Sequence, residues 1–124
     1  MFQNDYIIKN IQMMAQFIAS VIFKKKTTDY TIRRDADGNI DGLGDLCLQL
    51  HKMVDAGEIC KAEDLLFQAI DKEQSTDCLE LAVDFYGYLN TFEDKFLNDN
   101  DFSREEVAQG IEDIQRIYGI VNPT

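Results

Sequence analysis

Helical periodicity is the feature that most constrains how this chain can fold. Apolar residues recur every three or four positions in five segments, and no stretch makes a convincing sheet. At 124 residues with 45% apolar content, the chain can bury one modest core. We therefore predict an all-α protein in which residues 1–124 form a single helical domain.

The predicted domain has three parts. Residues 1–26 are expected to form a long N-terminal amphipathic helix, residues 27–42 an irregular linker rich in turn-forming residues, and residues 43–119 a helical body. Within the first helix, Tyr6 and Met13 widen the apolar surface beyond one stripe. We therefore expect this helix to pack on more than one side.

The first two helices of the body are expected to meet at a glycine turn. The segment places a glycine, small residues and large apolar residues in a set order at Gly57, Ile59, Ala62, Leu66, Ala69 and Ile70. It resembles one tetratricopeptide repeat, which has residues of these kinds at these positions. The resemblance implies a helical hairpin. Leu50 stands where the repeat has a small residue, and Gln74 stands where a proline usually closes it. We therefore expect a tetratricopeptide-like hairpin that is not part of a regular array.

Two further antiparallel helices are predicted after the hairpin. Ser75 or Thr76 can cap a helix whose broad aromatic face extends to Phe96. Ser103 is placed to cap the last helix, with Glu106 three residues later as its capping partner. These start signals complete a prediction of five helices.

Charge and cysteine content limit the partners and the compartment. The net charge is −11, and residues 1–34 carry six Lys or Arg and two Asp or Glu, whereas the remaining residues carry six and twenty-one. Such an acidic body disfavours nucleic acid as a partner. Three cysteines at irregular spacing, with no secretory segment before them, are typical of free thiols in a reducing compartment. We therefore expect a cytoplasmic location.

Membrane contact is disfavoured as well. The apolar stretch over residues 13–23 is too short to span a bilayer, and lysines follow it where a signal peptide would have them first. The basic residues Lys24–Lys26, Arg33 and Arg34 could still bind an acidic surface or an anionic membrane. An apolar helix beside a helical hairpin is nevertheless usually part of the core.

The acidic turn at the end of the linker is the leading candidate for a metal site. Asp37, Asn39 and Asp41 have the spacing of the first half of a calcium loop. Leu48, however, occupies the position that should supply a bidentate glutamate. The competing interpretation is a solvated turn in which Asp41 caps the next helix.

A zinc site is the weaker metal hypothesis. Cys47 and His51 lie one helical turn apart, and Cys60 lies on the adjoining helix. Structural zinc usually needs four ligands, Cys47 falls on an apolar stripe, and His51 could instead pair with Asp55. With a single histidine, the chain also offers no common nucleophilic constellation, and we expect no cofactor.

Carboxylates are abundant enough to raise the question of acid–base catalysis. Asp77, Glu80, Asp84 and Asp94 recur along the helix that follows Ser75. They form the polar strip of an amphipathic helix, so a solvated face is the better interpretation. A small enzyme using these carboxylates remains the second alternative for function.

A non-catalytic role in protein–protein interaction or assembly is the leading functional prediction. Leu81 and Tyr88 lie to the side of the aromatic stripe, where they are expected to open onto a groove for a protein partner or a second copy in a homodimer. The first alternative is a calcium- or other metal-binding regulatory protein that uses the turn over residues 37–42.

Four short segments spread over most of the chain carry a second resemblance: the opening Asn4–Ile7 and residues 62–67, 81–86 and 102–106. Through them the chain resembles a family of short uncharacterised proteins of Gram-positive bacteria. It implies a helical fold and a bacterial cytoplasm. It brings no assigned activity and no catalytic residues.

Overall fold

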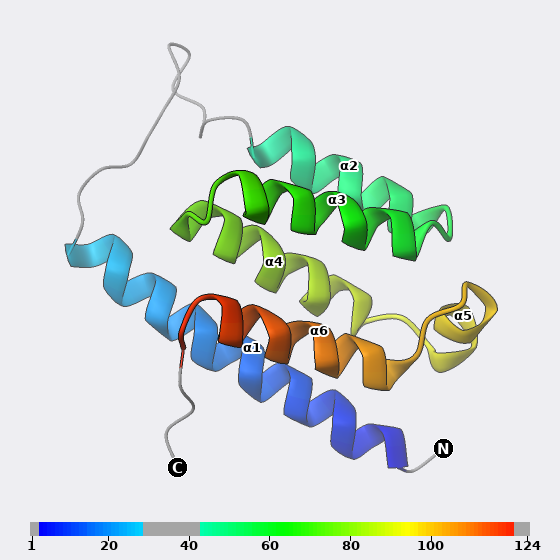
Figure 1. Cartoon of the computed structure of the whole chain (residues 1–124). Coiled ribbons are helices and arrows are strands. Elements are labelled where there is room, and N and C mark those ends of the chain that lie inside the picture. Colours follow the sequence, from blue (N-terminus) through cyan, green and yellow to red (C-terminus); the bar gives the residue numbers. More distant parts are fainter. Residues whose placement is uncertain (1–2, 29–42, 121–124) are drawn as a thin grey trace.

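The computed structural model describes residues 3–28 and 43–120, and these residues form helices and connecting turns without any strand. The all-α prediction is therefore confirmed (Figure 1). The helices are α1 (Gln3–Thr28), α2 (Leu43–Asp55), α3 (Ile59–Lys72), α4 (Thr76–Leu89), α5 (Asp94–Asp99) and α6 (Arg104–Ile117). Helix α1 continues through Thr28, so the predicted linker begins too early, and its residues 29–42 lie outside the described part of the chain.

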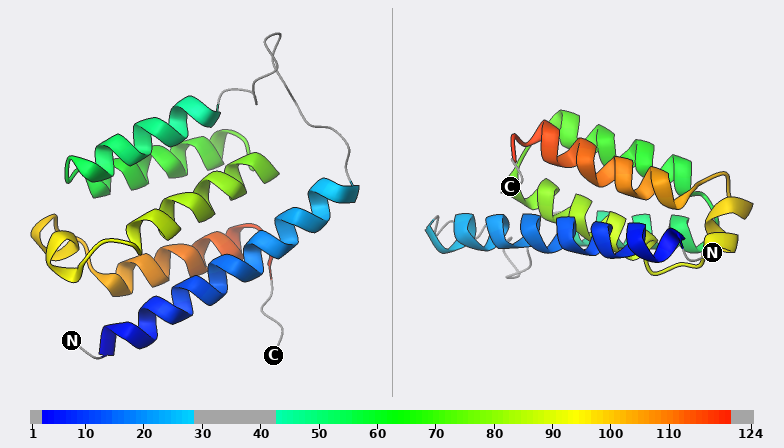
Figure 2. Two further views of the ribbon diagram at one scale, coloured as in Figure 1. Left: turned by 180° about the vertical axis from the view of Figure 1, so that it is seen from behind. Right: turned by 90° about the horizontal axis from the view of Figure 1, so that it is seen from below.

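The long helices lie in two layers. Helices α2, α4 and α1 lie side by side in one layer, and α3 and α6 lie in the other (Figure 2). Helix α4 is the central element, because it contacts α1, α2, α3 and α6. Its buried residues are Cys78, Leu79, Leu81, Ala82, Phe85, Tyr86 and Leu89. This helix therefore joins the two layers into one core.

The turn between α2 and α3 depends on Gly57. This residue has a positive φ of 83°, a backbone conformation that favours glycine. A Cβ atom at this position would also lie 2.3 Å from Oδ1 of Asn100, which follows α5. The sequence signal that predicted a helix end at Gly57 therefore corresponds to a conformational and a packing requirement.

Both predicted helix caps in the second half of the chain are confirmed. The Ser75 hydroxyl accepts a hydrogen bond from the Cys78 amide at 3.1 Å, so Ser75 is the cap of α4. The Ser103 hydroxyl accepts one from the Glu106 amide at 3.1 Å at the start of α6. Such caps satisfy amide groups that have no partner within the helix.

The predicted helix from Ser75 to Phe96 is wrong in one respect, because it is interrupted. Helix α4 ends at Leu89, and α5 begins only at Asp94. In the interruption, the carbonyl oxygens of Asn90 and Phe92 accept hydrogen bonds from the Arg104 guanidinium at 3.0 and 2.5 Å. If the helix continued, these carbonyl groups would accept hydrogen bonds from amides of the same helix. They can accept from the buried Arg104 guanidinium because the chain leaves the helical conformation after Leu89.

The packing expected for α1 is also only partly correct. Ile11, Ile18 and Ile22 are buried where α1 contacts α4 and α6. Tyr6 and Met13, in contrast, are 72% and 65% exposed. The apolar surface that these two residues add is therefore not covered by the described part of the chain, residues 3–28 and 43–120.

Arg104 connects four parts of the fold from a buried position. Besides the two carbonyl groups in the interruption, its guanidinium donates hydrogen bonds to Oδ1 of Asp94 at 3.0 and 3.1 Å and to Oδ1 of Asn90 at 3.1 Å. The Asn90 side chain in turn donates to the carbonyl of Ile8 on α1 at 3.2 Å. The guanidinium therefore links α6 with the end of α4, the start of α5 and, through Asn90, with α1.

Tyr86 makes the corresponding link between α4, α6 and α3. A Cβ atom at Gly110 of α6 would lie 2.3 Å from the Tyr86 ring, so glycine is required for this close approach. The Tyr86 hydroxyl then donates to Oε2 of Glu63 on α3 at 2.6 Å. Burial raises the pKa of Glu63 above its ordinary value of 4.5, and the hydrogen bond from Tyr86 partly opposes this effect.

Replacing Arg104 tests the first of these links. We expect Arg104→Ala to lower the free energy of unfolding by about 3–5 kcal/mol, because Asp94 and the turn carbonyls lose their buried donor. Arg104→Lys should recover little, since an ammonium group cannot reproduce the guanidinium fork. The matched control is the exposed Arg116→Ala, expected to change stability by about 0.5 kcal/mol or less. Urea unfolding measures all three, and equal effects at positions 104 and 116 would contradict the account.

Replacing Glu63 tests the second link through its pH dependence. Because the pKa of Glu63 is higher in the folded than in the unfolded chain, protonation of Glu63 favours the folded state. This contribution to stability is fully present below the unfolded pKa of 4.5, and it is lost as the pH rises through the folded pKa. We therefore expect Glu63→Gln to melt at a higher temperature than the parent at neutral pH, with a difference that shrinks toward pH 4. The exposed Glu112→Gln removes the same charge and serves as control. Identical shifts in the two variants at every pH would refute a special role for Glu63.

Candidate functional site

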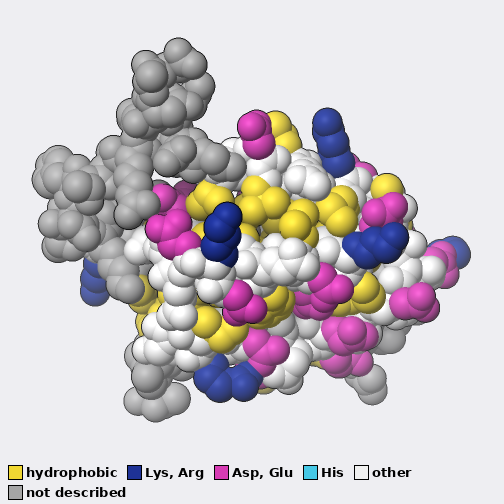
Figure 3. All heavy atoms as spheres, turned by 45° about the horizontal axis from the view of Figure 1, so that its top comes forward, with side chains coloured by type: hydrophobic (Ala, Val, Ile, Leu, Met, Phe, Trp, Pro, Cys, Tyr) yellow, Lys and Arg dark blue, Asp and Glu magenta, His cyan; other side chains and the backbone are white. Residues whose placement is uncertain are grey.

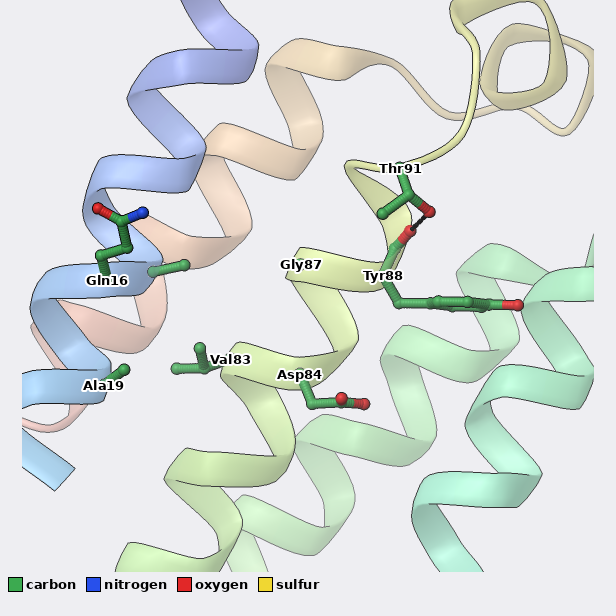
Figure 4. A pocket seen from close by; sticks show the side chains of 8 residues that line it. Gln16, Ala19, Val83, Asp84, Gly87, Tyr88 and Thr91 are labelled. Carbon is green, nitrogen blue, oxygen red and sulfur yellow. Dashed lines mark hydrogen bonds between the residues drawn. The ribbon is translucent and has the colours of Figure 1, made fainter. Parts of the chain in front are cut away.

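An open groove runs between α1 and α4 on the outer side of the α2–α4–α1 layer. Its volume is about 410 Å³, and it is lined by Ala15, Gln16, Ala19, Val83, Asp84, Gly87, Tyr88 and Thr91 (Figure 4). Small residues keep it open: a Cβ atom at Gly87 would meet nothing within 4 Å. The groove therefore has room for a side chain from outside the domain.

Asp84 and Tyr88 lie one turn apart on α4 and point toward α2, whereas Val83 points toward α1 (Figure 4). Across from them, Cys47 and His51 lie one turn apart on α2. Oδ2 of Asp84 lies 2.6 Å from Nε2 of His51 and 3.2 Å from Sγ of Cys47. Sγ of Cys47 lies 3.8 Å from the same histidine nitrogen. Two pairs of residues at helical spacing thus form one cluster beside the groove.

Tyr88 fixes the orientation of the His51 ring. The two rings are stacked with centroids 3.9 Å apart and an interplanar angle of 5°. The Tyr88 hydroxyl donates to Oδ1 of Asp55 at 2.5 Å, which holds the tyrosine against α2. This hydrogen bond raises the pKa of Tyr88 and keeps the phenol protonated.

The cluster does not have the geometry of a cysteine nucleophile with its base. In such a triad, the nucleophile and the orienting carboxylate contact different nitrogens of the histidine ring. Here Cys47 and Asp84 both contact Nε2 of His51. Burial and the neighbouring Asp84 also raise the pKa of the Cys47 thiol to about 11, which disfavours the reactive thiolate.

The predicted site residues are distributed differently from expectation. Tyr88 lines the groove, but Leu81 is only 5% exposed and faces the core of the chain. Leu81 belongs to the buried side of α4, one turn before Phe85, so it opens onto no groove. Asp37, Asn39 and Asp41 lie outside the described residues.

The other side chains considered for chemistry occupy separate places. Cys60 is exposed on α3 and approaches the carbonyl of Asp101 at 4.0 Å, whereas the cluster lies between α2 and α4. His51 pairs with Asp84 and not with Asp55, the alternative partner that the sequence offered. The Asp94 carboxylate, one of the four considered for acid–base chemistry, accepts from Arg104 and has a structural role.

Sequence reasoning missed the contact between Asp84 and the Cys47–His51 pair. The one-turn spacing within each helix is visible in the sequence. Which turn of α4 faces which turn of α2 depends on how the two helices pack. A periodic pattern alone could not specify that register.

The burial of Leu81 gives a direct test of this placement. We expect Leu81→Ser to lower the free energy of unfolding by about 2–4 kcal/mol, because it removes core contacts and buries a hydroxyl. Leu48→Ser makes the same change at a residue that is 62% exposed and should cost about 0.5 kcal/mol or less. Denaturant unfolding of both variants measures the difference. A near-neutral Leu81→Ser would mean that α4 presents a different face to the core.

Within residues 3–28 and 43–120, no helix has both the length and the apolar character needed to cross a membrane.

Comparison with known proteins identifies a family but no activity. No curated protein and no solved structure matches the chain. The model of the family described as "Family of unknown function (DUF6483)" matches residues 1–119. The chain therefore belongs to this family of unknown function.

Proposed function

We propose that this protein is a non-catalytic protein-interaction module that binds its partner in the groove between α1 and α4. The observation that carries the proposal is the groove itself, which is open and lined mainly by small and apolar side chains. A groove between two helices is a common binding site for an amphipathic helix.

The layered arrangement supports the same role. In repeat proteins, successive helical units place one helix of each unit side by side and so build an extended binding face. The order α2, α4, α1 in one layer, with α3 and α6 behind, is compatible with such a face (Figure 2). The tetratricopeptide-like character of the α2–α3 hairpin is part of this proposal.

Charge indicates the kind of partner. The chain has a net charge of −11, and the face shown in Figure 3 carries acidic side chains among hydrophobic ones, together with some Lys and Arg side chains. On the α4 side of the groove, Asp84 is exposed, and the exposed Glu80 lies one turn before it on the same helix. We therefore propose as partner an amphipathic helix with an apolar face and basic flanks, because opposite charges favour encounter and orientation.

A designed peptide pair tests this proposal. The probes are a fluorescent Leu/Lys amphipathic helix and its Leu/Glu counterpart with the same apolar positions, titrated by fluorescence anisotropy. We expect the Leu/Lys peptide to bind, and Gly87→Leu to weaken binding at least about tenfold, because the new side chain occupies the groove. Replacing a helical glycine also favours the helix, so the variant is expected to fold.

The matched control is Gly44→Leu. Gly44 is likewise helical with nothing within 4 Å of a Cβ position, but it lies on α2 away from the groove. It should bind the peptide like the parent. Binding that is equally strong in the Gly87 variant, or equally strong for the Leu/Glu peptide, would overturn the groove as the site.

Self-association is a second candidate and depends on a different surface. Tyr6 and Met13 lie two turns apart on α1 and are both highly exposed. Sedimentation velocity distinguishes the two candidates. A dimer that Tyr6→Lys with Met13→Lys dissociates would favour a homodimer, whereas a monomeric parent would leave the groove as the proposed binding surface.

Other functional predictions rest on the sequence. A cytoplasmic location in a bacterium and a calcium site over residues 37–42 stay predictions. An enzyme that uses the carboxylates of α4 and α5 is less well supported, since Asp94 is engaged by Arg104.

A further inference from the structure

We propose that Cys47, His51 and Asp84 together bind one zinc ion per chain at the junction of α2 and α4. One ligand atom from each residue, a sulfur, a nitrogen and an oxygen, lies within 4.8 Å of the other two. This site is separate from the acidic turn over residues 37–42, and it does not depend on partner binding in the groove.

The donor set favours zinc over the hard cations. Calcium and magnesium prefer oxygen ligands, whereas zinc binds cysteine sulfur, histidine nitrogen and carboxylate oxygen. Three protein ligands leave a fourth tetrahedral position for water or for a group from another molecule. Binding would release the thiol proton of Cys47 to solvent, because the ligand is the thiolate.

The distances require only a small adjustment. Around tetrahedral zinc, such donor atoms lie about 3.3–3.6 Å apart. The Cys47–His51 and Cys47–Asp84 distances of 3.8 and 3.2 Å are close to this range. The His51–Asp84 distance of 2.6 Å must widen by about 0.7 Å, and the Asp84 side chain, which is 46% exposed, has solvent on one side into which it can move.

The surroundings hold the ligands in place. Cys47 and His51 share one face of α2, and α4 packs directly against that helix. The stacked Tyr88 ring fixes the plane of His51, and its hydroxyl is held by Asp55. The stacking therefore limits the orientations that the His51 imidazole can take.

Cobalt titration of the metal-free protein provides the test, because Co²⁺ replaces Zn²⁺ and gives a thiolate charge-transfer absorption. We expect saturation at one equivalent, and displacement of Co²⁺ by Zn²⁺. Cys47→Ser should abolish the charge-transfer band, and Asp84→Asn should weaken Zn²⁺ binding at least about tenfold in competition with a chromophoric chelator. Zinc should also raise the melting temperature of the parent.

The matched control is Cys60→Ser, which removes an exposed thiol from α3 outside the cluster. It should titrate like the parent, and circular dichroism should show that every variant is folded. The proposal is overturned if the parent binds no stoichiometric metal, or if the charge-transfer band survives Cys47→Ser. Loss of the band in Cys60→Ser would overturn it as well, because it would place the thiolate ligand elsewhere.

Discussion

The burial of α4 between the two layers is the constraint on which the rest of the structure depends. This helix contacts α1, α2, α3 and α6, so its apolar residues contribute to most of the core. Two polar contacts also connect α4 to its neighbours. The Tyr86 hydroxyl passes Gly110 and donates to Glu63, and the turn after Leu89 accepts hydrogen bonds from the Arg104 guanidinium. Among the described residues, no buried side-chain polar atom lacks a hydrogen-bond partner. The central helix is therefore held by packing and by satisfied polar contacts together.

The same central position explains why the candidate sites lie where they do. A helix in the middle of a layer has neighbours on both sides, so its outward-facing residues border two junctions. On α4, Val83 and Gly87 border the junction with α1, where small residues leave a groove. Asp84 and Tyr88 point toward α2 and meet Cys47 and His51. The proposed binding groove and the proposed zinc site are therefore neighbours, because both include residues of α4.

Much of the fold could be predicted from local sequence signals, whereas the site depended on tertiary packing. Ser75, Ser103 and Gly57 marked helix ends through capping and backbone conformation, which act within a few residues. The break after Leu89 was not visible locally, because it serves a guanidinium that lies 14 residues further along the chain. Leu81 was misplaced for a related reason: a helix that contacts four others buries more than one stripe. The pairing of Asp84 with His51 similarly required the register between two helices.

Hydrogen exchange followed by mass spectrometry tests the central position of α4 most directly. Amides in an element that is buried on several sides exchange only through large openings of the fold, whereas exposed segments exchange through local fraying. We predict the slowest exchange in the peptides that cover residues 78–89, and markedly faster exchange in α5 over residues 94–99. Exchange in α4 that is as fast as in α5 would contradict the account, because it would show that α4 is not the element around which the other helices pack.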